Sequence, residues 1–123
     1  MTIIITSRPH GKNKYNARKM HYDGVTYDSK READYARELD LLRNARKPLE
    51  RVVDVQRQVR IPLVVNGQQI CTHVLDFLVT YADGRKELVE VKGYETAVWK
   101  LKRKLLEATW LREHEDVIYK IVR

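Results

Sequence analysis

Two carboxylates and a lysine lie close together in the most apolar part of this sequence. Asp76 is inside the apolar run of residues 74–79, and Glu90 and Lys92 follow after one short turn. Apolar strands normally exclude charged side chains, because burying an unpaired charge is costly. A divalent metal ion would explain two acids at this place, and such a site is typical of phosphodiester cleavage.

Strand geometry would bring these groups together. Glu90 and Lys92 are two residues apart, so in a strand they point to the same face. A turn at residues 82–85 would place Asp76 opposite Glu90 or one residue away, with Cβ atoms about 4.5–5.5 Å apart when directly paired. Two carboxylates so close repel each other unless a cation neutralises them, and Mg²⁺ prefers carboxylate oxygens. Lys92 could orient or deprotonate the attacking water, or stabilise charge on the phosphate.

The alternative explanation is that Asp76 and Glu90 are ordinary sheet carboxylates, one of them paired with Lys92. A Glu-x-Lys sequence is common and has little weight by itself. Asp76 is harder to explain in this way, because a buried acid without a partner costs several kcal/mol. The metal-site hypothesis therefore depends mainly on Asp76.

A helix should supply a third acid. Ser29 and Glu32 form the Ser-x-x-Glu capping-box pattern, which predicts a helix from this point to about Ala45. Its apolar side would contain Tyr35, Ala36, Leu39 and Leu42. Glu32 shares this side at helical spacing, so it should point toward the sheet and could join the metal shell through water or hold a second ion. The capping box alone would also account for Glu32.

The rest of the pattern predicts a small mixed α/β domain. A short hairpin around Asp23-Gly24 should precede the helix. Strands are expected at residues 52–65, 69–81, 86–92 and 117–122, with a tight turn at Asn66-Gly67. Alternation points Val53, Val55, Val59, Ile61 and Leu63 toward the core, although Arg57 breaks the series.

A second helix is predicted over residues 96–113. We expect its sheet-facing side to contain Val98, Leu101, Leu105 and Ala108, and Trp99 and Trp110 to be packing residues. Another side carries basic residues that could contact phosphates, although a solvated helix face would look the same. These basic residues are Lys100, Lys102, Arg103 and Lys104.

Composition indicates one domain with an acidic partner. The chain has 123 residues, 43% of them hydrophobic, a net charge of +7 and a pI of about 9.6. This charge favours nucleic acid as partner. A basic arm is expected over residues 1–21 and a single domain over residues 22–123; the arm contacts nucleic acid or is a solvated tail. Its cations are Lys12, Lys14, Arg18 and Lys19.

The same composition excludes several other classes of protein. The single cysteine, Cys71, excludes an intrachain disulfide and fits a reducing compartment. The first ten residues contain too few apolar side chains for a signal peptide, and no apolar run approaches membrane-spanning length. We therefore expect a cytoplasmic protein without a membrane partner.

The acids and the lysine, in this order, resemble the PD-(D/E)XK nuclease superfamily. Glu32 precedes Asp76, and Glu90-x-Lys92 follows on the next strand. Residues 14–33 also resemble a group of small phage and prophage proteins regarded as endonucleases. The resemblance covers most of the chain, roughly from Lys14 to the end, and implies a restriction-endonuclease-like core. This core is a mixed, mainly antiparallel sheet flanked by two helices, in the order αβββαβ.

The resemblance also implies a role for each matching residue. Asp76, Glu90 and the Val91 carbonyl would bind Mg²⁺ or Mn²⁺, with Lys92 as the catalytic lysine and Glu32 as the helix acid. Gln56 matches a glutamine often found on the first strand and would have a supporting role. One position departs from the motif, since Leu75 replaces the proline before the aspartate. That proline has no chemical role, so the departure leaves the chemistry intact.

These expectations point to a metal-dependent DNA endonuclease that leaves a 5′-phosphate. Selectivity for junctions or branched DNA, with a homodimer as the active form, suits a short phage protein without a separate recognition domain. The main alternative is a phage DNA-binding or packaging module that uses the same fold without cutting. An RNA-directed nuclease and an inhibitor of a host enzyme have no sequence feature in their favour, because aromatic residues are only 8% and show no base-stacking motif.

Overall fold

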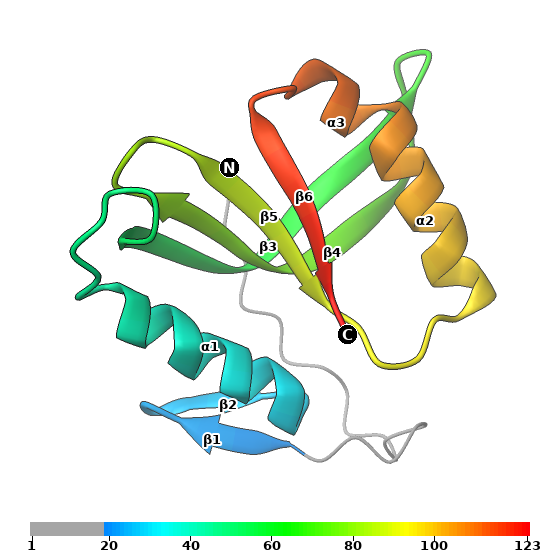
Figure 1. Cartoon of the computed structure of the whole chain (residues 1–123). Coiled ribbons are helices and arrows are strands. Elements are labelled where there is room, and N and C mark those ends of the chain that lie inside the picture. Colours follow the sequence, from blue (N-terminus) through cyan, green and yellow to red (C-terminus); the bar gives the residue numbers. More distant parts are fainter. Residues whose placement is uncertain (1–18) are drawn as a thin grey trace.

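The sheet at the centre of the molecule has a helix on each face (Figure 1). The structure, a computed structural model, describes residues 19–123. Its elements are β1 (Met20–Tyr22), β2 (Val25–Tyr27), α1 (Lys30–Leu42), β3 (Val52–Val65), β4 (Gln68–Tyr81), β5 (Lys86–Val91), α2 (Ala97–Ala108), α3 (Trp110–Glu113) and β6 (Val117–Val122). The main sheet has the order β3-β4-β5-β6, and only the β5–β6 pair is parallel. The expected mixed α/β architecture, mainly antiparallel with two flanking helices, is confirmed.

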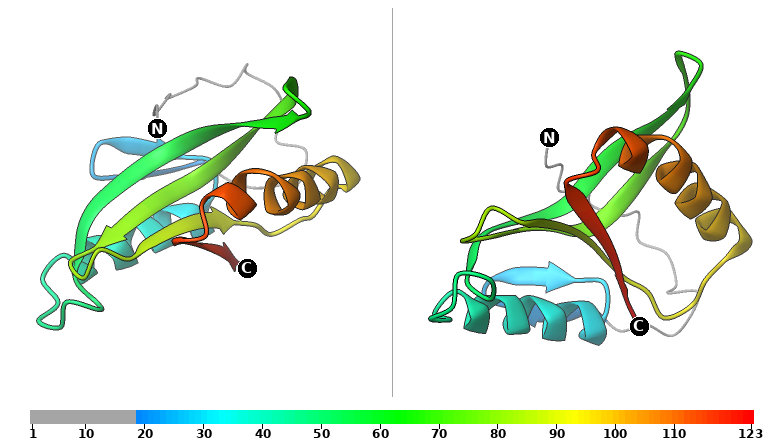
Figure 2. Two further views of the ribbon diagram at one scale, coloured as in Figure 1. Left: turned by 90° about the horizontal axis from the view of Figure 1, so that it is seen from above. Right: turned by 45° about the horizontal axis from the view of Figure 1, so that its top comes forward.

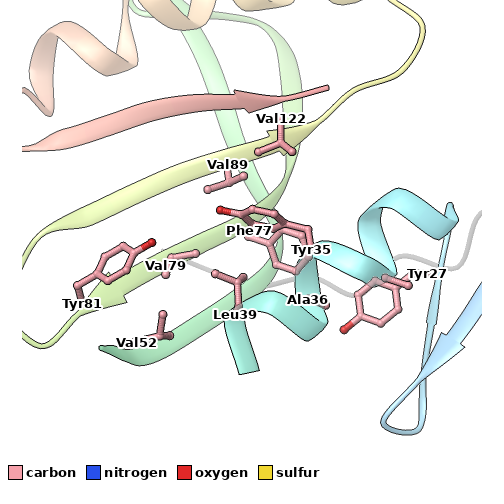
Figure 3. Close-up of a cluster of buried hydrophobic side chains, with 11 residues drawn as sticks. Tyr27, Tyr35, Ala36, Leu39, Val52, Phe77, Val79, Tyr81, Val89 and Val122 are labelled. Atoms are coloured by element: carbon pink, nitrogen blue, oxygen red, sulfur yellow. The ribbon is translucent and has the colours of Figure 1, made fainter. Parts of the chain in front are cut away.

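Neighbouring residues of β5 show why the two helices lie on opposite faces. Val89 packs in one cluster with Tyr35 of α1, whereas Leu88 packs in another with Leu106 of α2. Successive strand residues point to opposite faces, so each cluster fills one side of the sheet. Figure 3 shows the α1-side cluster, in which the Tyr35 and Phe77 ring centroids are 5.6 Å apart.

Both predicted two-residue turns are confirmed. Asp23 and Gly24 have φ angles of 50° and 74°, and Asn66 and Gly67 have φ angles of 50° and 77°. Two consecutive residues with positive φ are the mark of a type I′ hairpin, which Asn-Gly and Asp-Gly favour. The second turn closes the long β3–β4 hairpin, whose tip projects beyond the rest of the sheet (Figure 2).

The first helix begins as predicted and ends earlier. Its N-cap is Ser29, whose Oγ accepts a hydrogen bond from the Glu32 backbone N–H at 3.1 Å. The helix ends at Leu42, three residues before the predicted end. Tyr35, Ala36 and Leu39 are buried as expected, so this helix presents its predicted side to the sheet.

The prediction for β3 is correct in its bounds and wrong at Val53. Val52 is buried while Val53 is 52% exposed, because the pairing with β4 shifts register between Val52 and Asp54. Such a bulge reverses the alternation locally. The first strand of the chain, β1, begins at Met20, two residues before the expected start of the domain.

The predicted sheet-facing side of the second helix is confirmed at Leu105, which packs against the α2-side cluster, and is wrong at Val98, Leu101 and Ala108. Val98 and Leu101 are 64% and 60% exposed, while Trp99 and Leu106 are buried. The helix is therefore turned about its axis relative to the expectation, and it breaks at Thr109 into α2 and the short α3. Two apolar stripes compete on this helix, and the larger Trp99 and the fully buried Leu106 belong to the one that packs.

At Gln58 the alternation along β3 is reversed, so that odd-numbered residues before and after it point to opposite faces of the sheet. Val55 packs on the α1-side cluster, whereas Val59 is in the α2-side cluster, although both have odd positions on the same strand. Gln58 has a φ of 51°, a left-handed conformation that is uncommon outside glycine. The flanking pairs Arg57↔Phe77 and Val59↔Leu75 keep one register. The irregular backbone thus explains why Arg57 interrupts the apolar series.

Within residues 19–123, no helix is long and apolar enough to cross a membrane.

Candidate active site

Asp76 lies where β4 and β5 separate. Their last backbone pair at this end is Phe77↔Val89, and one further step in the same register would put Asp76 opposite Glu90, as predicted. Figure 2 shows the two strands moving apart toward this end. There the Asp76 Oδ2 accepts a hydrogen bond from the Val91 backbone N–H at 2.7 Å. The side chain thereby satisfies a strand N–H that β4 no longer pairs with its backbone.

The surroundings of Asp76 disfavour the ionised form of its carboxyl group. The residue is half-buried. Burial raises its pKa well above the usual value, and the negative charges of Glu32 and, more weakly, Glu90 raise it further. The Val91 hydrogen bond and the charge of Lys92 act in the opposite direction. The charges of all three other residues predicted for the site, Glu32, Glu90 and Lys92, therefore influence the pKa of Asp76.

Glu32 reaches this region from α1. Its side chain is only 4% exposed, and its Oε1 is 3.9 Å from Arg57 Nη2 and 3.5 Å from Gln58 Nε2, which donates to it. The Arg57 guanidinium also lies over the Tyr27 ring, 4.1 Å from its centroid. The helix acid is thus buried against β3, as the sequence pattern predicted, and a cation next to it offsets part of the burial cost.

Glu90 is held by side chains from two other strands. It is 5% exposed; its Oε1 is 3.2 Å from His73 Nε2 of β4, and its Oε2 accepts from Tyr119 Oη of β6 at 3.0 Å. Burial alone would raise the pKa of Glu90, but the His73 and Tyr119 contacts outweigh it and lower the pKa. Burial and the charge of Glu90 in turn raise the pKa of Tyr119, which stays a donor. Glu90 is therefore an oriented, ionised carboxylate.

Lys92 follows β5 directly. Its backbone N–H donates to Val122 O at 2.8 Å, which extends the contact with β6 by one residue. Its ammonium lies 5.5 Å from the centroid of the Trp99 ring of α2, a cation–π arrangement. Lys92 and Glu90 thus share the α2 side of the sheet, as their spacing predicted.

Gln58, not Gln56, accompanies the acids. Gln56 lines a separate cavity with Leu78 and Trp110. Gln58 is buried and bonds Glu32, because its left-handed backbone turns the side chain to the α1 side. The structure thus brings Gln58, and not Gln56, into contact with one of the predicted acids.

The predicted basic face of α2 is only partly free. Lys102 is half-buried and its Nζ donates to Thr72 O at 3.2 Å, while Arg103 pairs with Glu107 at 2.7 Å. Lys100 and Lys104 are exposed. Lys19 is also exposed, and the other predicted arm residues lie outside the described part of the chain. These are Lys12, Lys14 and Arg18.

Sequence reasoning missed three functional contacts. His73 and Tyr119 hold Glu90, and Gln58 holds Glu32. A histidine in the apolar second strand was a usable signal, since buried polar groups need partners. Nothing in the sequence marks Gln58, because its role depends on a backbone conformation that glutamine does not favour.

The described residues contain no preformed group of three or more His, Cys, Asp or Glu side chains positioned as metal ligands. The structure brings the predicted acids into one electrostatic group, with Asp76 between an α1 acid and a β5 acid, but it does not gather their oxygens around one point.

Fold and site together define a mixed α/β domain with buried acids at a strand fork. A family model described as "Protein of unknown function (DUF1064)" matches residues 12–123, and the chain belongs to this family. Comparisons with curated proteins and with solved structures gave no match.

Proposed function

We propose that this protein is a metal-dependent DNA endonuclease with a restriction-endonuclease-like core of the PD-(D/E)XK type. The observation that carries the proposal is the position of the Asp76 carboxylate where two strands part, hydrogen-bonded to the Val91 N–H and close enough to Glu32 and Glu90 for their charges to raise its pKa. Placing Asp76 near two acids from two other elements does not favour stability, and perturbed carboxyl groups concentrate at functional sites.

The donor set suits Mg²⁺ or Mn²⁺. Carboxylate oxygens and a backbone carbonyl are hard ligands of the kind Mg²⁺ prefers, and a divalent cation would offset the repulsion at Asp76. Asp76, Glu90 and the Val91 carbonyl would hold the ion, with Glu32 beside it. When bound, the metal would supply charge neutralisation at the phosphate.

The chain's own residues would orient and assist. His73 and Tyr119 fix the Glu90 carboxylate, so its direction is set before a ligand arrives. The Val91 N–H fixes one oxygen of Asp76 in the same way. Lys92 would place a cation, or after loss of its proton a base, next to the scissile phosphate.

DNA is the proposed substrate because of the net charge of +7. Preference for branched DNA and action as a homodimer in the cytoplasm are parts of the same proposal.

The test is cleavage of labelled four-way junction, flap, duplex and single-stranded DNA in Mg²⁺ and Mn²⁺. Wild type should cut, and Asp76→Asn and Lys92→Met should each cut about 100-fold more slowly or worse. Glu50→Gln is the matched control, since Glu50 is an exposed carboxylate in the loop after α1. It should leave cleavage unchanged.

Two results would overturn the proposal. Equal cleavage by wild type and Asp76→Asn would remove the acids from the mechanism. Salt-sensitive DNA binding by both proteins, with cutting by neither in either metal, would favour the non-catalytic DNA-binding module.

A further inference from the structure

A cavity of about 530 Å³ lies apart from the acids, between the sheet and the segment that contains α3. This volume is within the range of small-ligand pockets, about 300–1,000 Å³. Its apolar lining includes Ile61, Leu78 and Val117. None of the four acidic and basic residues assigned to cleavage lines it, so its chemistry belongs to a different site.

A flat aromatic pair forms part of the wall. The rings of Trp110 and His114 are nearly parallel, with an interplanar angle of 11° and centroids 3.8 Å apart. His114 Nδ1 donates to Trp110 O at 2.8 Å, which holds the imidazole in place. Because the two rings stack on each other, a ligand can use only an outer face of the pair. Such a face suits a flat heterocycle, because bases stack on aromatic side chains regardless of sequence.

Two cations without acidic partners line the same cavity. Among residues 19–123, no carboxylate lies within ion-pair distance of Arg60 or Lys86. Arg60 comes from β3 and Lys86 from the start of β5. Free basic groups beside an aromatic wall fit a phosphate attached to a base, since both side chains bind phosphate oxygens well.

Two further lining groups can read polar edges. The Gln56 Oε1 is buried and has no hydrogen-bond partner within the described chain. Buried acceptors are rarely left unsatisfied, so this amide is available to a ligand or to water once it reorients. The Asp116 carboxylate, also without a partner among these residues, can accept from an exocyclic amino group of a base.

We propose that this cavity binds a nucleotide, with the base against Trp110 and His114 and the phosphate on Arg60 and Lys86. The ligand is a free nucleotide or a nucleotide displaced from a DNA strand, and both share this chemistry. The cavity is distinct from the acids, because Lys86 and Glu90 are four residues apart along β5, about 13 Å at the usual rise per residue.

The experiment is a fluorescence titration of the full chain in EDTA with the four 5′-deoxynucleoside monophosphates. Saturable quenching is expected, and Trp110→Phe should abolish it while Trp99 still reports folding. Arg60→Ala and Lys86→Ala should each weaken binding about fivefold, the size of one charged contact near a surface. Lys47→Ala removes the same charge from an exposed position in the loop after α1 and should change affinity less than twofold.

Three outcomes would overturn the inference: no saturable quenching by any nucleotide, equal weakening by Lys47→Ala and Lys86→Ala, or competition by inorganic phosphate as strong as that by nucleotides. Competition by duplex DNA with one extra unpaired base, but not by matched duplex, would support the strand as the source. Binding of free nucleotides without such competition would support the free ligand. Because EDTA excludes metal-dependent cleavage from this assay, its failure and the failure of the nuclease proposal can be told apart.

Discussion

The Asp76 side chain bonds the Val91 backbone N–H at 2.7 Å and so occupies a place that strand backbone would otherwise fill. This contact joins β4 to β5 beyond Phe77↔Val89, their last backbone pair at this end. It also positions a carboxylate beside Glu90 and within reach of the charge of Glu32. The fork between the strands and the acidic site are thus one feature.

Replacement of Asp76 by asparagine should stabilise the metal-free protein. The pKa of Asp76 is raised in the folded state, so at pH values between its unfolded and folded pKa the protein takes up a proton on folding. The free energy of unfolding therefore falls as the pH rises from the unfolded pKa through the folded pKa. Asparagine can still accept from Val91 but carries no charge. We expect Asp76→Asn to gain on the order of 1 kcal/mol at pH 7.5 in EDTA.

Urea unfolding at pH 5 to 8 measures this difference. The advantage of the variant over wild type should shrink as the pH is lowered and Asp76 is protonated. A variant less stable than wild type at pH 7.5 would contradict the electrostatic account. Saturating Mg²⁺ should reduce the advantage, since the cation would stabilise only the wild-type carboxylate.

Loss of the Tyr119 hydroxyl should weaken the fold through Glu90. Tyr119→Phe removes the hydrogen bond to Oε2 and leaves the ring packing, so we expect a loss of about 1–2 kcal/mol at pH 7. The pKa of Glu90 is lower in the folded protein than in the unfolded chain. This difference stabilises the fold at pH values above the pKa of the unfolded chain, and the stabilisation is lost as the pH falls through the pKa of the folded protein. The deficit of the variant should therefore be largest near neutral pH and smaller in acid. Equal deficits at pH 3.5 and 7 would show that packing, and not the hydrogen bond, is responsible.

Two leucines on α2 test its orientation. Leu106 is fully buried and Leu101 is 60% exposed, so Leu106→Ala should cost about 2–5 kcal/mol and Leu101→Ala less than about 0.5. Chemical denaturation of both variants measures the difference directly. The opposite order would restore the side of the helix that sequence periodicity favours.

Local pattern determined much of this fold. The Asn66-Gly67 turn, the Ser29 cap and the bounds of β3 and β6 follow from short-range chemistry, and the structure has them where the sequence predicts them. Positive φ at Asn-Gly and a serine hydroxyl at a helix start depend on few neighbours. Such features can therefore be predicted from a few residues.

The candidate site could be predicted only in part from such local sequence patterns. The sequence placed Glu32, Asp76 and Glu90 on their correct elements, because period and turn position suffice for that, while Lys92, predicted as the end of a strand, directly follows β5. It could not place Gln58 beside Glu32, since that contact depends on an unfavourable backbone conformation stabilised by both strands. The partners of Glu90 come from β4 and β6, which meet only in the folded sheet.

The rotation of α2 shows the same division. Its sequence has an apolar stripe at Val98 and Leu101 and another at Trp99 and Leu106, and helical periodicity treats both alike. Packing against the sheet selects the second stripe, because Leu75 and Leu88 of the sheet form one cluster with Leu106. The sequence by itself determined the elements and the acids they carry; tertiary packing decided which sides meet, because burial is settled between surfaces and not along the chain.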